Sequence, residues 1–345
     1  MLVNAYFLKG KLMQLRNLVV LFFLLVNGPL VMGSSEEEGR LASLIAEDKR
    51  DMPSYISLAS LELARGDLSA ADATIRRGLR YARLSQAKLE LRTLGIRLED
   101  ENLDFKAALR HYRRAARLKE SSQFAAVHLA MANVYLQARN FEQAHELLRL
   151  SLTADSLNNE GAEISLQRLQ TIERAILVTN SPFAYDESIS RGEVSRLLNQ
   201  DLMVNEYLNG SAGQSIGETS DQGLTDYALS EFADDILVTH RLNLRSFRIR
   251  NGSFKPDNMM SRRELAMLVE DLLYLKLKVS RTSFIGTQSP FLDLPSSATS
   301  FNAFMSAVTR GLMQAGEDGN IRPDALVSGA EAILVLHNLK QILQR

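Results

Sequence analysis

The sequence lacks cysteine and tryptophan altogether, and its 345 residues include only seven prolines. Without a thiol, the chain has no disulfide, no thiolate nucleophile, no iron–sulfur cluster and no cysteine-ligated zinc. Between residues 40 and 155 the only proline is Pro53, and apolar residues recur there at three- and four-residue spacing. Because proline inside a helix removes a hydrogen bond and clashes with the preceding turn, this stretch is predicted to be helical throughout.

An excess of charge is also missing, since 40 lysines and arginines face 41 acidic residues. A protein that coats nucleic acid needs surplus cations, so nucleic acid is not an expected partner. The chain contains no phosphate-binding loop, no dinucleotide-binding glycine motif, no H-E-x-x-H and no G-x-S-x-G. The acidic pair Asp234-Asp235 has nothing to mark it as a glycosidase pair. His111, His128 and His145 fall at different repeat positions, so no shared metal site is expected. We therefore predict a protein that is not an enzyme and has no cofactor or metal.

The amino terminus has the order of a secretory signal. Basic residues up to Arg16 precede the apolar run "LVVLFFLLV" (18–26), and Asn27-Gly28-Pro29 breaks the helix before small residues and an acidic stretch. The run is shorter than the roughly 20 residues of a membrane span, so residues 1–33 are predicted to be a signal peptide cleaved after Gly33. The alternative is a single uncleaved anchor helix. Either way the protein is expected in the periplasm or cell envelope, touching the membrane only through this segment.

A repeating pattern runs through residues 34–156. Each repeat has a small residue on its first helix, a short polar turn and an alanine on its second helix. The alanines Ala71, Ala108 and Ala144 follow one another at intervals of 37 and 36 residues. Small residues at these positions allow two helices to pack closely. The second repeat is expected to carry one extra residue in its turn.

This pattern resembles tetratricopeptide repeats, although the usual tryptophan and the closing proline are missing. The resemblance implies an α-solenoid of helical hairpins that binds an unknown protein partner. Arginines are frequent in the span 76–119. They indicate either solvated outer faces or a basic concave surface for an acidic peptide or polymer. They are Arg76, Arg77, Arg80, Arg83, Arg92, Arg97, Arg110, Arg113, Arg114 and Arg117.

The second half of the chain repeats a loop-to-helix device. The segment "GSFKPDNMMSRRELAMLVEDLL" (252–273) aligns with "GNIRPDALVSGAEAILVLHNL" (319–339), and "SPFAYDESISRGEVSRLLNQDL" (181–202) is a third copy. In each copy a serine is followed three residues later by a glutamate, which is the capping box of a helix start and stabilises it by about 1 kcal/mol. The predicted capping pairs are Ser190 with Glu193, Ser261 with Glu264, and Ser328 with Glu331.

The full order of the device resembles the S-layer homology module. That module has a Phe-x-Asp start, a helix, a Gly-x-Phe-x-Pro-Asp loop and a second helix that opens on Ser/Thr-Arg-x-Glu. The resemblance implies a mostly helical domain of three pseudo-repeats over residues 157–345, so the whole protein is expected to be mainly α. The copies are expected at about 165–204, 231–278 and 290–343, with "FADDILV" as the Asp-containing extended start of the second. A Gly- and Ser-rich loop fills 205–226.

Capping does not require Arg191 and Arg262, which follow the capping serines. The resemblance implies that modules of this kind bind cell-wall glycan or peptidoglycan non-covalently and that these arginines contact the anionic glycan. The alternative is a salt bridge with Asp186 or Asp257. In the third copy Gly329 replaces the arginine, and the first copy lacks the Gly-x-Phe-x-Pro opening.

Three functions therefore remain open. The protein is an envelope protein that holds the cell wall at one end and a protein partner at the other. Alternatively, it is a periplasmic assembly factor or scaffold whose degenerate modules bind only protein. A glycan-active enzyme would need a catalytic pair that the sequence does not contain.

Overall fold

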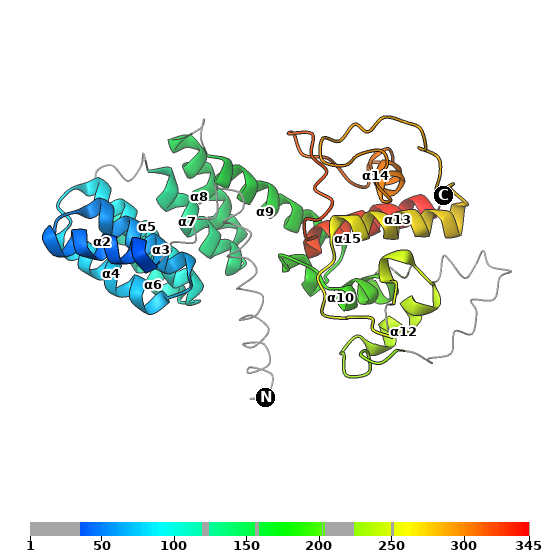
Figure 1. Cartoon of the computed structure of the whole chain (residues 1–345), viewed down its shortest axis with the longest axis horizontal. Coiled ribbons are helices and arrows are strands. Elements are labelled where there is room, and N and C mark those ends of the chain that lie inside the picture. Colours follow the sequence, from blue (N-terminus) through cyan, green and yellow to red (C-terminus); the bar gives the residue numbers. More distant parts are fainter. Residues whose placement is uncertain are drawn as a thin grey trace. The chain divides into compact units, whose positions relative to one another are not determined.

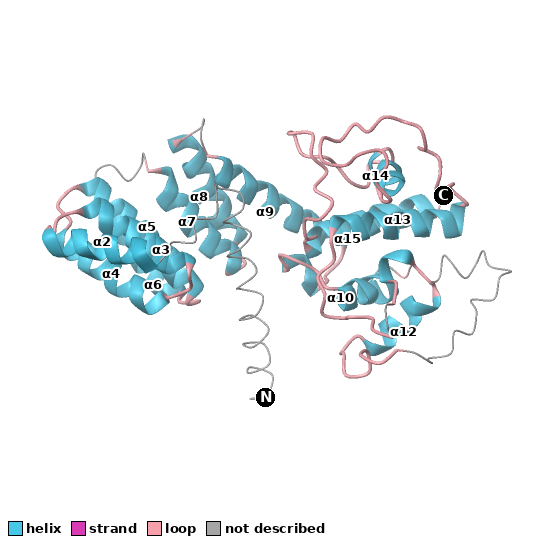
Figure 2. Cartoon of the chain, in the orientation of Figure 1, coloured by secondary structure: helices cyan, strands magenta, loops and turns pink. Residues whose placement is uncertain are grey.

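The computed structural model describes residues 35–118, 124–155, 159–201, 203, 224–249 and 252–344. These residues are mainly helical, and none of them forms a β-strand, as expected for a mainly α protein (Figure 2). Within this part of the chain, no helix has the length and apolar character needed to cross a membrane. The signal predicted over 1–33 and residues 205–223 of the Gly- and Ser-rich loop lie outside the described residues.

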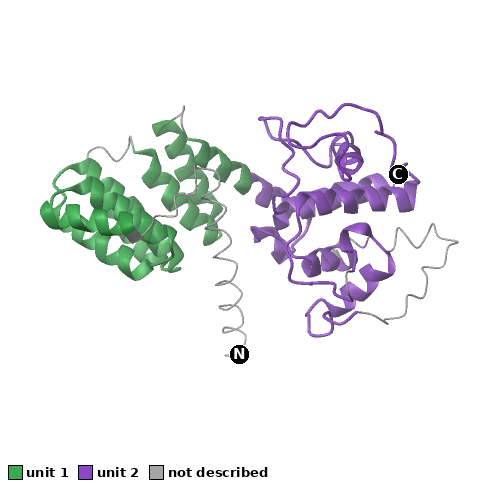
Figure 3. Cartoon of the chain, in the orientation of Figure 1, with its two compact units in different colours: residues 1–169 green, residues 170–345 purple. Residues whose placement is uncertain are grey.

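The chain divides into two compact units, Met1–Leu169 and Gln170–Arg345 (Figure 3). Unit 1 is an array of helical hairpins that follow one another along the chain (Figure 1). Its described helices are α2 (Ser35–Glu47), α3 (Met52–Ala64), α4 (Leu68–Tyr81), α5 (Ser85–Glu101), α6 (Phe105–Ala115), α7 (Ala125–Gln137), α8 (Phe141–Ala154) and the first part of α9 (Glu160–Val178).

The hairpins α3–α4, α5–α6 and α7–α8 share one turn. Each has three residues, with the middle one in the left-handed region: Gly66 at φ 77°, Leu103 at φ 57° and Arg139 at φ 57°. The third residue of each turn caps the next helix, because Asp67 and Asp104 accept the amide hydrogens of Ala70 at 3.0 Å and Ala107 at 2.9 Å. The prediction of an extra residue in the second turn was wrong. The extra length of that repeat lies outside the turn.

The alanines that defined the repeat are at the centre of these hairpins. Ala71, Ala108 and Ala144 are all completely buried. On the first helices of the hairpins, Ala59 and Ala132 are likewise fully buried. A larger side chain at any of these positions would force the helices of a pair apart.

Unit 2 contains the three copies of the loop-to-helix device. Helix α13 packs against both α14 and α15 (Figure 1). Apolar residues on these helices, such as Leu268, Phe304 and Leu336, are completely buried. The described elements are the end of α9, η2 (Pro182–Tyr185), α10 (Arg191–Arg196), η3 (Leu197–Asp201), α12 (Ala233–Arg241), η4 (Arg245–Phe247), α13 (Arg262–Leu277), α14 (Phe301–Val308) and α15 (Gly329–Leu343).

Candidate functional site

A closed ring of backbone hydrogen bonds joins the three copies in unit 2. The amide of Ile189 donates to the carbonyl of Val327 at 2.9 Å, Val327 donates to Met260 at 3.0 Å, and Met260 donates to Ile189 at 2.8 Å. Each of the three side chains is completely buried. These residues occupy the same place in each copy, immediately before the capping serine. The copies are therefore pseudo-equivalent lobes around a common centre.

A capping serine follows each residue of the ring. Ser190 and Ser261 form complete capping boxes with the glutamates three positions on, Glu193 and Glu264. Ser328 accepts the amide hydrogen of Glu331 at 3.2 Å and so caps α15. The predicted return contact from Glu331 is not formed, because its carboxylate pairs with Arg262 instead. The three helices consequently begin beside the ring. The residue after each serine, which is Arg191, Arg262 or Gly329, contacts the neighbouring copy.

Arg191, the first residue of α10, is held by the second copy. Its Nε donates to the carbonyl of Phe254 at 2.9 Å and its Nη1 to that of Ser246 at 2.8 Å. Nη1 also lies 3.5 Å from the carboxylate of the capping residue Glu264. The guanidinium lies over two rings, 4.9 Å from the centroid of Phe254 and 5.4 Å from that of Phe247. Burial lowers the pKa of Arg191, and Glu264 acts in the opposite direction.

Arg262, the first residue of α13, repeats this arrangement with the third copy. Its Nε donates to the carbonyl of Ile321 at 2.9 Å, its Nη2 to that of Gln314 at 2.8 Å, and its Nη1 pairs with the capping residue Glu331. Burial raises the pKa of Glu331, and the arginine offsets part of that effect. Each arginine thus spans two copies and pairs with the glutamate that lies three residues after the capping serine of the next copy. The ion pairs are between copies, whereas the sequence suggested partners within a copy.

The junction between the third and first copies has no arginine. Gly329 stands at the arginine position, and its amide donates to the carbonyl of Asp186 at 2.9 Å. A Cβ on Gly329 would collide with the backbone of Phe183, reaching 2.7 Å from its carbonyl carbon. Within the described residues, no arginine reaches Glu193. The glycine in the third copy and the missing Gly-x-Phe-x-Pro opening in the first are thus two sides of one contact: without that opening, η2 of the first copy lies where the side chain would be.

An aspartate holds the loop of each of the other two copies. Asp293 accepts the amides of Ile321 at 2.8 Å and Arg322 at 2.7 Å. Asp226, 67 residues earlier, accepts those of Phe254 and Lys255, each at 2.8 Å. The extended start of the second copy therefore contains Asp226. The segment "FADDILV" (232–238), interpreted as that start, instead opens α12.

We expect Asp226→Ala to release the loop of the second copy and to destabilise unit 2 by about 2 kcal/mol, because it removes charge-assisted hydrogen bonds to three donors. The third donor is the hydroxyl of Ser253, at 2.5 Å. Burial favours the neutral acid, but the hydrogen bonds prevail and lower the pKa of Asp226. Amide hydrogen exchange at Phe254 measures the release. Asp257→Ala removes an exposed acid from the same loop, and comparable loss there would contradict the assignment.

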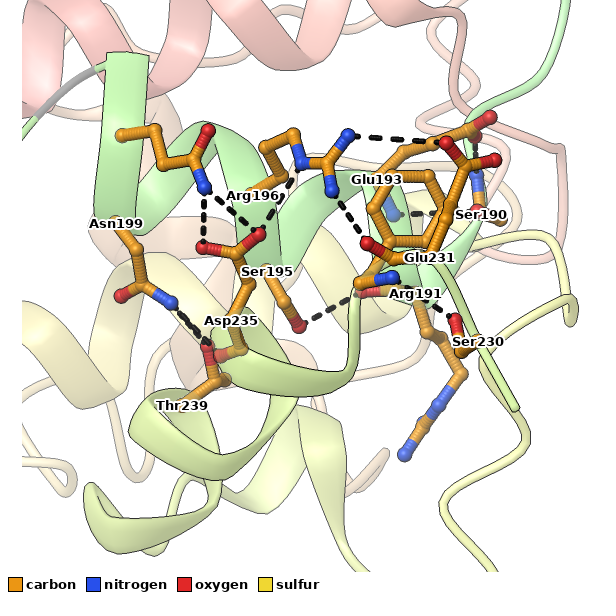
Figure 4. A network of polar contacts seen from close by, with 12 residues as sticks. Ser190, Arg191, Glu193, Ser195, Arg196, Asn199, Ser230, Glu231, Asp235 and Thr239 are labelled. Atoms are coloured by element: carbon orange, nitrogen blue, oxygen red, sulfur yellow. Dashed lines mark hydrogen bonds and ion pairs between the residues drawn. The ribbon is translucent and has the colours of Figure 1, made fainter. Parts of the chain in front are cut away.

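A second polar network joins the first two copies (Figure 4). Arg196 of α10 donates from Nε to the carboxylate of Asp235 at 3.1 Å, and its Nη1 lies 3.8 Å from that of Glu231. Asn199 donates to the backbone carbonyl of Asp235 at 2.7 Å and to the hydroxyl of Thr239 at 3.3 Å. Asp235 is 5% exposed. Through its carboxylate and its backbone carbonyl, Asp235 therefore joins α10 and η3 to α12, which is a structural role.

His111 and His128 in unit 1 have different surroundings. His128 is buried, with its Nδ1 3.1 Å from the hydroxyl of Tyr112. His111 packs against Gly95. In the part of the chain that the structure describes, no group of three or more histidine or acidic side chains is placed to hold a metal ion.

Comparison with protein families identifies one matching region. Residues 290–333 match the S-layer homology domain. The match spans the third copy from its extended start through Asp293 and the loop to the capping pair Ser328 and Glu331. No curated protein and no solved structure matches the chain. This kind of domain is a binding module, and its presence supports attachment to cell-wall polymers and a location at the cell surface or envelope. The chain therefore contains an S-layer homology domain.

Proposed function

We propose that the protein is an exported, non-catalytic protein of the cell envelope that joins the cell wall to a protein partner. In this proposal unit 2 attaches non-covalently to cell-wall glycan or peptidoglycan, and the hairpins of unit 1 act as tetratricopeptide-like repeats that bind the partner. The observation that carries it is the S-layer homology match over 290–333. The hydrogen-bond ring through Ile189, Met260 and Val327 supports extending the same module to all three copies.

Arg191 and Arg262 remain the proposed glycan contacts, but their surroundings limit what they can offer. All three nitrogens of Arg262 already donate to protein acceptors. Arg191 has only Nη2 without a partner among the described residues. A glycan would therefore share these arginines with the protein. Their first role is to shape the junctions in which a polymer would lie.

The same observation favours a second candidate function. Arg191 and Arg262 bind acceptors within the fold, and the third junction has Gly329 in place of an arginine. In the second candidate, unit 2 therefore binds protein and not glycan, as part of a periplasmic assembly factor or scaffold. The two candidates differ in one measurable property, which is affinity for the cell wall.

We expect the full chain to sediment with purified peptidoglycan at low salt and Arg191→Ala and Arg262→Ala to reduce the bound fraction. Arg263→Ala is the matched control, because Arg263 is a partly exposed neighbour paired at 2.8 Å with Asp324 and its loss removes the same charge. Hydrogen exchange on each variant separates lost binding from lost folding. Wild type that stays in the supernatant rejects cell-wall attachment and leaves the scaffold function. Release of soluble fragments from labelled peptidoglycan would instead identify an enzyme.

A further inference from the structure

The first two hairpins of unit 1 differ at one pair of equivalent positions. In the first hairpin the guanidinium of Arg77, on α4, lies 5.9 Å from the centroid of the Tyr55 ring, on α3. The equivalent residues 37 positions later are Arg92 on α5 and Arg114 on α6. Arginine has thus replaced the ring that receives the guanidinium in the first hairpin. Two cations therefore occupy the pair of positions at which the first hairpin has a favourable cation–π contact, and Arg114 acts electrostatically on Arg92.

Two side-chain nitrogens of this cluster lack a hydrogen-bond partner. Nη1 of Arg92 and Nδ1 of His111 are buried and have no hydrogen-bond partner. The His111 ring fits against α5 only because residue 95 is glycine, since a Cβ there would overlap the ring. A buried polar group without a partner costs about 1–3 kcal/mol, and more when it is charged. The helix dipole favours Arg114, in the last turn of α6, but not Arg92, near the middle of α5.

The charges around His111 are mainly positive. Burial, followed by Arg92 and Arg114, lowers its pKa to about 4, and Arg110 acts in the same direction. The one acid that opposes them is Asp72 on α4, whose carboxylate is already paired with Arg76 at 2.8 Å. The pKa of Arg92 is lowered by burial and by Arg114. Nothing described in the chain supplies the anion that this cluster needs.

We propose that Arg92, His111 and Arg114 form an anchor for a carboxylate on an acidic segment of the partner protein. Arg114 is exposed and Arg92 is partly buried, so a carboxylate can approach from solvent. Planar guanidinium groups match the two oxygens of a carboxylate. A bound carboxylate places a negative charge beside the two arginines and offsets their mutual repulsion. The anchor rests on the proposed role of unit 1 in binding a protein, and it names the chemistry of that partner.

A protonated His111 adds a third positive charge to the anchor. Because a nearby anion favours the imidazolium, its pKa rises when the carboxylate binds, and binding takes up a proton. Affinity therefore increases as the pH falls from neutrality toward 5, while the glutamate carboxylates of the ligand are still ionised. The charged groups that act on His111 from the neighbouring positions are Asp72, Arg92, Arg110 and Arg114, and the pH dependence is therefore tested on His111 itself.

The test uses the full chain and a fluorescein-labelled hexaglutamate peptide in a polarisation titration at low salt. We expect Arg92→Met and Arg114→Met each to weaken binding about tenfold, the effect of losing one charge-assisted hydrogen bond. Arg77→Met is the matched control, because it removes the same charge from the equivalent position of the first hairpin and is expected to bind as wild type does. Binding should be several-fold tighter at about pH 5.5 than at about pH 7.5, and His111→Gln should abolish that difference.

Several outcomes decide the proposal. Equal loss in Arg77→Met and Arg114→Met, or no binding by well-folded wild type, overturns it. If labelled polyphosphate binds as tightly as hexaglutamate, with the same dependence on Arg92 and Arg114, the anchor binds an anionic polymer and the proposal of an acidic protein segment is overturned. The proposed function is checked separately by cross-linking in the native envelope. If wild type and Arg114→Met capture the same partner equally, only the anchor is overturned. If hexaglutamate binds but no partner is captured, the anchor is supported and the partner-binding role of unit 1 is rejected.

Discussion

Gly329→Ala is expected to unfold the packing between the third and first copies and to destabilise unit 2 by at least about 3 kcal/mol. The reason is the nature of the obstacle. A Cβ at this position meets the backbone carbonyl of Phe183, which cannot rotate away as a side chain can. To make room, η2 must move, and the ring of hydrogen bonds through Ile189 must move with it. Hydrogen exchange of α13 and α15, followed by mass spectrometry, measures the effect separately from unit 1.

Two other glycines provide graded controls for this prediction. A Cβ on Gly192 would lie 2.5 Å from Cδ2 of the Phe232 ring, which can shift, so Gly192→Ala is expected to cost about 1–3 kcal/mol. Gly39, inside α2, has nothing within 4 Å of a Cβ, so Gly39→Ala should stabilise unit 1 by up to about 1 kcal/mol and leave unit 2 unchanged. Wild-type protection in Gly329→Ala would show that Phe183 does not close the third junction.

The parts of the fold that follow from local chemistry could be predicted from the sequence. The alanine spacing predicted the hairpins, because only small residues allow two helices to pack at that distance. The predicted caps concern a serine and a glutamate three residues apart, and both partners are visible in one short segment. The caps Asp67 and Asp104 were missed, although an aspartate just before an amphipathic helix is a sufficient signal.

The features that depend on residues far apart in the chain could not be predicted. Ile189, Met260 and Val327 are ordinary apolar residues, and nothing local shows that their backbones form a ring. The aspartate of the second copy was placed at "FADDILV" because an aromatic residue precedes it, whereas Asp226 follows Leu224-Thr225 and lacks that mark. Its role depends on a loop that begins 26 residues later.

The acceptors of the two junction arginines also could not be predicted. Arg191 and Arg262 were identified as residues that capping does not need, and that reasoning selected the two side chains that span the junctions. Their acceptors are carbonyls and a glutamate of the next copy, 52 or more residues away along the chain. A lone sequence offers no way to pair them. Gly329, which the sequence shows only as a missing arginine, is required by the backbone of Phe183, which lies where a side chain would be.

Arg262→Ala is expected to destabilise unit 2 at neutral pH by about 3 kcal/mol, because removing one partner of a partly buried ion pair leaves the other charge uncompensated. That charge is Glu331, whose pKa burial already raises while Arg262 lowers it. Without the arginine, the pKa of Glu331 rises further. The variant also leaves the carbonyls of Ile321 and Gln314 without a donor. Denaturant unfolding of wild type and variant, monitored by exchange of α15, gives the difference in the free energy of unfolding.

The pH dependence distinguishes this cause from a simple loss of packing. A carboxyl group whose folded pKa lies above its unfolded value stabilises the protein when protonated, and that contribution is lost as the pH rises above about 4.5, through the folded pKa. The defect of Arg262→Ala should therefore be larger at about pH 8 than at about pH 5. Glu331→Gln combined with Arg262→Ala should remove most of the pH dependence.

Glu193→Gln is the matched control for the glutamate, since Glu193 occupies the same place in the first copy but receives no arginine among the described residues. It is expected to cost less than about 1 kcal/mol, because the amide oxygen of glutamine still accepts the Ser190 amide that Glu193 accepts at 2.7 Å. A defect in Arg262→Ala that stays constant from about pH 5 to pH 8 would show that the lost carbonyl contacts, rather than the charge of Glu331, account for the instability. The junction arginine would then act through hydrogen bonding alone, and Arg262→Gln should recover part of the lost stability at every pH.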